Sequence, residues 1–185
     1  HTDAAARALN GQGHIFAFEP HPHTHGLLCK SLLLNGFAEM TQAHQAAVSN
    51  RTGRHPLFLG RTSGHHSLYA LDGRSMSQAE TIDVPLLRID DIVDSKLPVD
   101  LIKIDVEGAE LEVLEGAMAT IERNADVALI VEFGQQHLRR TGQTVAHWLG
   151  EFERLGMRYC AIEPTSGELL DWAPGQAGAE PSDNL

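Results

Sequence analysis

The chain has 185 residues, of which 42% are hydrophobic, so it is long enough to bury one sizeable core. Its 25 acidic residues outnumber its 14 lysines and arginines and give a net charge of −11. Such a charge repels phosphate backbones and argues against nucleic acid as a partner. With two distant cysteines and no apolar run of ~18 residues, we expect a cytoplasmic protein without a disulfide framework or a membrane span.

Strand and helix patterns alternate along the first fifty residues. Residues 13–20 (GHIFAFEP) form a short apolar run that predicts a strand. Residues 25–36 (HGLLCKSLLLNG) predict a helix closed by the Asn-Gly pair. Cys29, within this apolar segment, is expected to be a buried thiol. Residues 43–50 (AHQAAVSN) predict one further strand.

Residues 51–88 have a different character, because glycine- and serine-rich turns separate short β-like pieces. This pattern predicts an antiparallel excursion from the main sheet. Beyond it, we expect strands at residues 100–105 and 126–133, helices at 109–123 and 143–156, and a closing hairpin over 158–172.

This order of elements predicts an α/β fold with a mainly parallel sheet flanked by helices. Residues 167–172 (GELLDW) are expected to add one antiparallel strand at its edge. We assign residues 1–173 to a single domain. The tail at 174–185 has no periodicity and is expected to be disordered.

Three of the predicted strands end in an acid, at Glu19, Asp105 and Glu132. In open α/β sheets, ligands bind beyond the carboxyl ends of the strands. Asp105 and Glu107 also project to the same side, so these carboxylates could hold Mg²⁺ or assist proton transfer directly. The structural alternative is that Lys103 pairs with Glu107 and that Glu110 caps the next helix.

Histidines suggest a competing metal site, because imidazoles are common metal ligands. They lie at alternating positions after the first strand and in a pair within the excursion: His21, His23, His25, His65 and His66. If the segment after residue 20 is helical, its three histidines do not share a face, so we expect surface positions. His66 or His147 could serve as a base.

Several segments together resemble one enzyme family. They are AFEPHP (17–22), LLLNG (32–36), AAVSNRTG (46–53), TIDVPLLRIDDIV (81–93), DLIKIDVEGAELEVLEGA (100–117) and LIVEF (129–133). On these residues the sequence resembles the FkbM-type S-adenosylmethionine-dependent methyltransferases. The resemblance covers about residues 13–133.

The resemblance implies a Rossmann-like sheet and methyl transfer to a hydroxyl of a small molecule or carbohydrate. S-adenosylmethionine would be the cofactor, the involvement of Mg²⁺ is left open, and a homodimer is allowed. Cofactor contacts are expected from Glu19 on the ribose, from Pro20 next to it, from Ala47, Val48 and Ser49 around the adenine, and from Asp105 beside the methionine part. Catalysis is expected from Asp105, Glu107 and Glu132, and acceptor binding from His66 and Ser67.

One departure from the family pattern concerns the start of the chain. A first strand and a glycine-rich loop of the form Asp-x-Gly-Ala-Asn-x-Gly are expected about one helix before residue 13. Residues 1–12 instead resemble the last turns of that helix, so we expect an incomplete sheet. The alternatives to a methyltransferase are a metal-dependent hydrolase and a degenerate Rossmann module that only binds.

Overall fold

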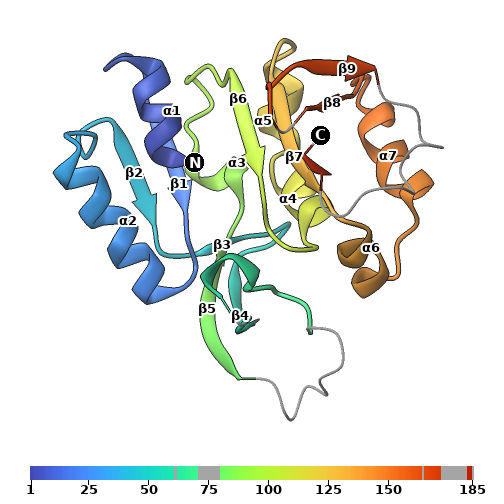
Figure 1. Ribbon diagram of the computed structural model, residues 1–185, viewed down its shortest axis with the longest axis horizontal. Helices are drawn as coiled ribbons and strands as arrows, with labels where there is room; N and C mark the ends of the chain where they lie inside the picture. Colours follow the sequence, from blue (N-terminus) through green and yellow to red (C-terminus); the bar gives the residue numbers. More distant parts are fainter. Residues whose placement is uncertain (61, 71–79, 164, 172–182, 185) are drawn as a thin grey trace.

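The computed structural model describes residues 1–60, 62–70, 80–163, 165–171 and 183–184. The chain begins with α1 (Thr2–Leu9) and a parallel strand pair, β1 (Ile15–Phe18) and β2 (Thr41–His44). These strands are joined by α2 (Pro22–Leu34), which packs beside them (Figure 1). The predicted helix therefore forms and ends at the Asn-Gly pair, although Cys29 on it is exposed rather than buried.

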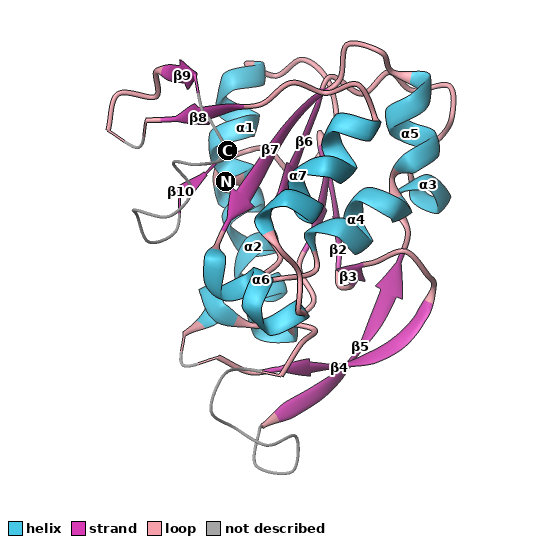
Figure 2. Ribbon diagram, turned by 90° about the vertical axis from the view of Figure 1, so that its right-hand side faces the viewer, coloured by secondary structure: helices cyan, strands magenta, loops and turns pink. Residues whose placement is uncertain are grey.

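An antiparallel excursion follows, as predicted. β3 (Ala47–Val48) runs parallel to β5 (Thr81–Leu87), and β4 (Gly53–Phe58) pairs antiparallel with β5. We call β4 and β5 the hairpin; it projects away from the rest of the molecule in both views (Figures 1 and 2). The segment predicted as one strand at 43–50 is divided between β2 and β3 by a bend, because its two parts pair with different strands.

The short helix η1 (Ser63–His65) lies between β4 and β5, and α3 (Ile89–Ile92) follows β5. The chain then forms a second parallel pair, β6 (Leu101–Ile104) and β7 (Ala128–Phe133). The connection was predicted as a single helix but consists of α4 (Glu110–Gly116) and α5 (Met118–Arg123). The interruption lies where Gly116 meets the carbonyl of Ser49. A Cβ at Gly116 would stand 2.1 Å from that oxygen.

The C-terminal part contains α6 (Gln135–Thr141), α7 (Val145–Arg154) and the antiparallel strands β8 (Cys160–Ile162) and β9 (Leu169–Asp171). The β8–β9 pair confirms the antiparallel reversal predicted over residues 158–172. However, β9 pairs with β8 in a separate ladder and does not extend the pair formed by β6 and β7. β10 (Asp183–Asn184) pairs antiparallel with β7. The rest of the tail beyond residue 173, predicted to be disordered, lies outside the described residues.

The molecule has a mixed α/β architecture with two hydrophobic clusters. The larger joins β6 and β7 to α4, α5 and α7, which cover one face of this strand pair (Figure 2). The smaller is formed by residues of β3, β4 and β5, together with Leu68 after β4 and Ala109 at the start of α4. Val106 packs against both clusters, so the turn after β6 sits where they meet. No helix in the described part of the chain has the length and apolar content needed to cross a membrane.

Candidate active site

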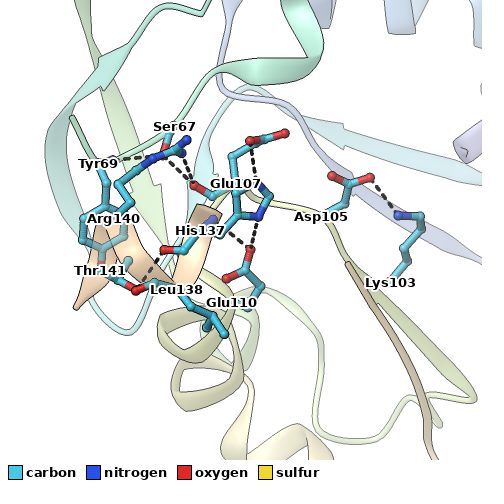
Figure 3. Close-up of polar contacts among 11 residues, drawn as sticks. Ser67, Tyr69, Lys103, Asp105, Glu107, Glu110, His137, Leu138, Arg140 and Thr141 are labelled. Carbon is cyan, nitrogen blue, oxygen red and sulfur yellow. Dashed lines mark hydrogen bonds and ion pairs between the residues drawn. The ribbon is translucent and has the colours of Figure 1, made fainter. Parts of the chain in front are cut away.

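The turn after β6 and the end of β7 bring two predicted acids together. The carboxyl groups of Asp105 and Glu132 interact with each other. Lys103 Nζ lies 2.8 Å from Asp105 Oδ2 (Figure 3). Lys103 therefore neutralises an acid as expected, but its partner is Asp105 and not Glu107. His1 Nε2 also approaches Asp105 Oδ2, at 3.4 Å.

These contacts shift the pKa values of Asp105 and Glu132 in opposite directions. Burial disfavours ionisation of Asp105, but the hydrogen bonds from Lys103 and Glu132 outweigh it and lower the pKa of Asp105. Burial, together with the bond to Asp105, raises the pKa of Glu132 to about 7. Near neutral pH the pair thus contains one firmly ionised carboxylate and one carboxyl group that exchanges its proton, which suits general acid–base chemistry.

Glu107 occupies a strained position in the same turn. Its backbone has a φ of 56°, in the left-handed region that side chains other than glycine rarely adopt and that is common at functional sites. Two donors fix its carbonyl oxygen: Ser67 Oγ at 2.7 Å and Arg140 Nη1 at 2.9 Å. The segment between β4 and β5, through Ser67, and helix α6, through Arg140, therefore both hold this turn in place (Figure 3).

The carboxylate of Glu107 pairs with a histidine that the sequence analysis did not select. His137 Nε2 lies 2.9 Å from Glu107 Oε2, and His137 Nδ1 lies 3.8 Å from Glu110 Oε1. The hydrogen bond to Glu107 raises the pKa of His137. Gly134 permits this placement, because a Cβ there would lie 2.8 Å from His137 Nδ1.

Glu110 closes the turn from its other end. Its carboxylate accepts the backbone amide of Gly108 at 2.8 Å. The predicted capping role is wrong, because α4 begins at Glu110 with Ala109 as its N-cap and has no side-chain cap hydrogen bond. Only 3% of Glu110 is exposed, and burial raises its pKa despite the amide.

The expected cofactor residues lie in two environments. Glu19 follows β1 and is half-buried, with Oε1 accepting the amide of His21 at 2.8 Å, and burial raises its pKa. Pro20, next in the chain, is also half-buried. His21 packs against His66 with 4.8 Å between ring centroids, so the loop after β4 reaches the end of β1.

The segment expected near the adenine is enclosed by protein. Ala47 and Val48 belong to the smaller and larger clusters, respectively. Ser49 is fully buried and donates a hydrogen bond to Glu112, whose other oxygen accepts the hydroxyl of Tyr69. The side chains of these three residues are thus engaged inside the fold.

The remaining candidates are also accounted for. Ser67 is buried and binds Glu107, so the structure brings it to the catalytic candidates through its hydroxyl. His66 is half-buried, its Nδ1 accepts the amide of Gly60, and burial lowers its pKa. His147 lies exposed on α7.

Among the residues that the structure describes, one group of side chains could hold a metal ion. Ligand atoms of Glu107, Glu132 and His137 all lie within 4.8 Å of one another. The predicted set was Asp105, Glu107 and Glu132; in the structure His137 takes the place of Asp105. The only signal in the sequence was a histidine four residues after the last residue of LIVEF, and its distance from the strand end depends on the fold of α6.

Comparisons with known proteins agree on one family. A model described as the methyltransferase FkbM domain matches residues 2–159. The chain is 30% identical over 133 residues to Methyltransferase sdnD from Sordaria araneosa, covering 57% of this chain and 51% of that protein. It is 30% identical over 123 residues to Methyltransferase 1 from Beauveria bassiana, covering 57% and 49%. The chain therefore spans about half the length of these curated relatives.

A crystal structure supports the fold. Methyltransferase FkbM from Methylobacillus flagellatus superposes with a TM-score of 0.51 at 18% identity, over 83% of this chain and 33% of that one.

Proposed function

Because the chain belongs to the FkbM methyltransferase domain family, we propose that the complete protein is an S-adenosylmethionine-dependent O-methyltransferase that acts on a hydroxyl of a small molecule or carbohydrate. The observation that carries the proposal is the position of Glu19 and Asp105 at the carboxyl ends of β1 and β6, in parallel strand pairs. Ligands of open α/β sheets bind at such strand ends.

We extend the proposal to a Rossmann-like sheet in the complete protein. β1 pairs with β2 and β6 pairs with β7, while among the described residues no strand pairs with the other edge of β1 or of β6. These two edges face each other across the molecule (Figure 1). An additional strand between them would satisfy both rows of backbone groups, and a glycine-rich loop after it would lie near Glu19 and Asp105.

The donor set at the end of β1 fits the cofactor. A carboxylate offers about four acceptor positions, and the described contacts of Glu19 use one oxygen for the amide of His21. The other can accept from the two hydroxyls of a ribose. Pro20 is assigned next to the ribose, and the backbone of residues 47–49 to the adenine.

The carboxylates after β6 and β7 are assigned to the acceptor. S-adenosylmethionine supplies an electrophilic methyl group when it is bound. Asp105, kept ionised by Lys103, would accept a hydrogen bond from the acceptor hydroxyl, orient its oxygen and take its proton as the oxygen–methyl bond forms and the methyl–sulfur bond breaks, with S-adenosylhomocysteine as the leaving group. Glu132 stabilises the resulting charge distribution through its hydrogen bond to Asp105.

Calorimetric titration of the full-length protein with S-adenosylhomocysteine tests the proposal. We expect one binding site per chain, and methyl transfer from S-adenosylmethionine to a hydroxyl in a panel of sugars and hydroxylated small molecules. A full-length, folded protein that binds neither compound would contradict the proposal and favour a degenerate module.

A further inference from the structure

Three side chains of metal-ligand type converge beside the strand ends. Glu107 comes from the turn after β6, Glu132 from the end of β7 and His137 from the first turn of α6. One ligand atom of each lies within 4.8 Å of the other two. Glu107 and His137 are enclosed, with only 11% of each side chain exposed.

The separation of the first two ligands suits one shared cation. Glu107 Oε2 and His137 Nε2 lie 2.9 Å apart. Ligands at ~2.1 Å from a cation and at right angles to each other are about 3.0 Å apart. The two atoms therefore already have the separation of adjacent ligands of one cation, and the imidazole ring would turn so that the deprotonated Nε2 points to the cation instead of to Glu107.

The third ligand has an unused oxygen. Glu132 Oε2 is buried and accepts no hydrogen bond from the described part of the protein. Buried carboxylate oxygens are normally paired, because an unpaired one has lost its water without compensation. A bound cation would supply the missing partner.

The surroundings hold the ligands in place. The carbonyl of Glu107 is fixed by Ser67 and Arg140, which maintains its left-handed backbone. Glu110 lies on the far side of the His137 ring, 3.8 Å from Nδ1. At metal sites a carboxylate behind a ligating imidazole orients the ring through a hydrogen bond; here 3.8 Å is beyond hydrogen-bond distance, and His137 Nδ1 has no hydrogen-bond partner among the described residues.

We propose that Glu107, Glu132 and His137 bind one divalent cation, and that Mn²⁺ binds more tightly than Mg²⁺. Mg²⁺ prefers oxygen ligands alone, whereas Mn²⁺ accepts carboxylate oxygens and lies in the transition-metal series that also binds imidazole. Three protein ligands leave coordination positions open for water or for a hydroxyl. A role for the cation in binding the acceptor hydroxyl would rest on the proposed methyltransferase function; cation binding itself does not.

Metal binding can be measured without the cofactor. Full-length protein freed of metal with a chelator is titrated with Mn²⁺ alone, and free Mn²⁺ is followed by electron paramagnetic resonance. We expect one Mn²⁺ per chain, at least ~10-fold weaker binding in His137→Gln and Glu132→Gln, and weaker binding of Mg²⁺ than of Mn²⁺ to the wild type. His147→Gln and Glu115→Gln are the matched controls, since both positions are exposed, and both should bind Mn²⁺ normally.

A second readout guards against variants that fold poorly. Mn²⁺ should raise the melting temperature of the wild type and of both controls, and should leave that of Glu132→Gln and His137→Gln unchanged. The site is refuted if the wild type binds no Mn²⁺ or if the two ligand variants bind it as tightly as the controls. Equal or tighter binding of Mg²⁺ refutes the stated preference. Titration of the same metal-free protein with S-adenosylhomocysteine reports separately on the methyltransferase proposal.

Discussion

His137 Nε2 and Glu107 Oε2 lie 2.9 Å apart in a largely buried ion pair that joins α6 to the turn after β6. The hydrogen bond to Glu107 raises the pKa of His137. Because the folded-state pKa is raised, the stabilisation is complete below the pKa of an unfolded histidine, about 6.5, and is lost as pH rises through the folded-state pKa.

In metal-free protein, His137→Gln should therefore cost more unfolding free energy at about pH 6 than at about pH 9. Urea denaturation at the two pH values measures this difference. His147→Gln, at an exposed position, should show a similar small effect at both. An equal loss in His137→Gln at both pH values would show that packing, and not the ion pair, accounts for its stability.

A second prediction concerns Glu110, whose pKa is raised by burial. A carboxyl group with a raised folded-state pKa contributes a penalty that appears as pH rises above the unfolded value of about 4.3 and is complete above the folded-state pKa. Glu110→Gln keeps an acceptor for the Gly108 amide and removes the charge. The variant should gain stability relative to the wild type between about pH 4 and pH 8, as measured by urea denaturation. Glu115→Gln, exposed on the same helix, should show no such trend.

The role assigned to Glu19 is tested by affinity. In the complete protein, Glu19→Ala should weaken binding of S-adenosylhomocysteine by about 1–3 kcal/mol, because charge-assisted hydrogen bonds to the ribose are lost. Glu39→Ala, at an exposed position before β2, is the control. Unchanged affinity in Glu19→Ala would mean that the ribose is held elsewhere.

The role assigned to Asp105 is tested by turnover. Asp105→Asn preserves shape and removes charge, so it should lower kcat by about 10²-fold or more, the scale of losing a general base. The melting temperature should stay close to that of the wild type, since 34% of the side chain is exposed. Asp126→Asn, exposed before β7, should retain full turnover. Near-normal turnover in Asp105→Asn would leave these carboxylates as a structural network.

The interruption between α4 and α5 gives a prediction about folding. Gly116→Ala places a methyl group 2.1 Å from the carbonyl oxygen of Ser49, and backbone must move to accommodate it. We expect a loss of about 1–3 kcal/mol in unfolding free energy. Gly150→Ala, in α7, meets nothing within 4 Å and should be neutral or gain up to ~1 kcal/mol. Equal stability of the two variants would contradict this account of the interruption.

Much of the fold could be predicted from the sequence because its strands are short apolar runs with clear boundaries. β1, β6 and β7 form where expected, and each places an acid near its carboxyl end. The pairing of Lys103 with an acid also follows from their alternation on one face of β6. These features are local, so neighbouring residues are enough to define them.

The site itself depends on contacts between distant segments. α6 is too short and polar to produce a helical apolar pattern, and it is anchored mainly through buried Leu138. His137 therefore could not be assigned to Glu107 from the sequence. The burial of Ser49 likewise depends on Glu112 and Tyr69, which come from α4 and from the segment after β4.

The hydrogen bonds that Ser67 and Arg140 donate to the carbonyl of Glu107 also bear on how this site can diversify. Ser67 anchors the loop beside the hairpin, while the strands β4 and β5 extend outward from it. We expect the outer hairpin to tolerate exchange as long as Ser67 and Tyr69 keep their partners. Selection for a new acceptor could then act on the outer part of β4 and β5 while the proposed cofactor end at Glu19 stays unchanged.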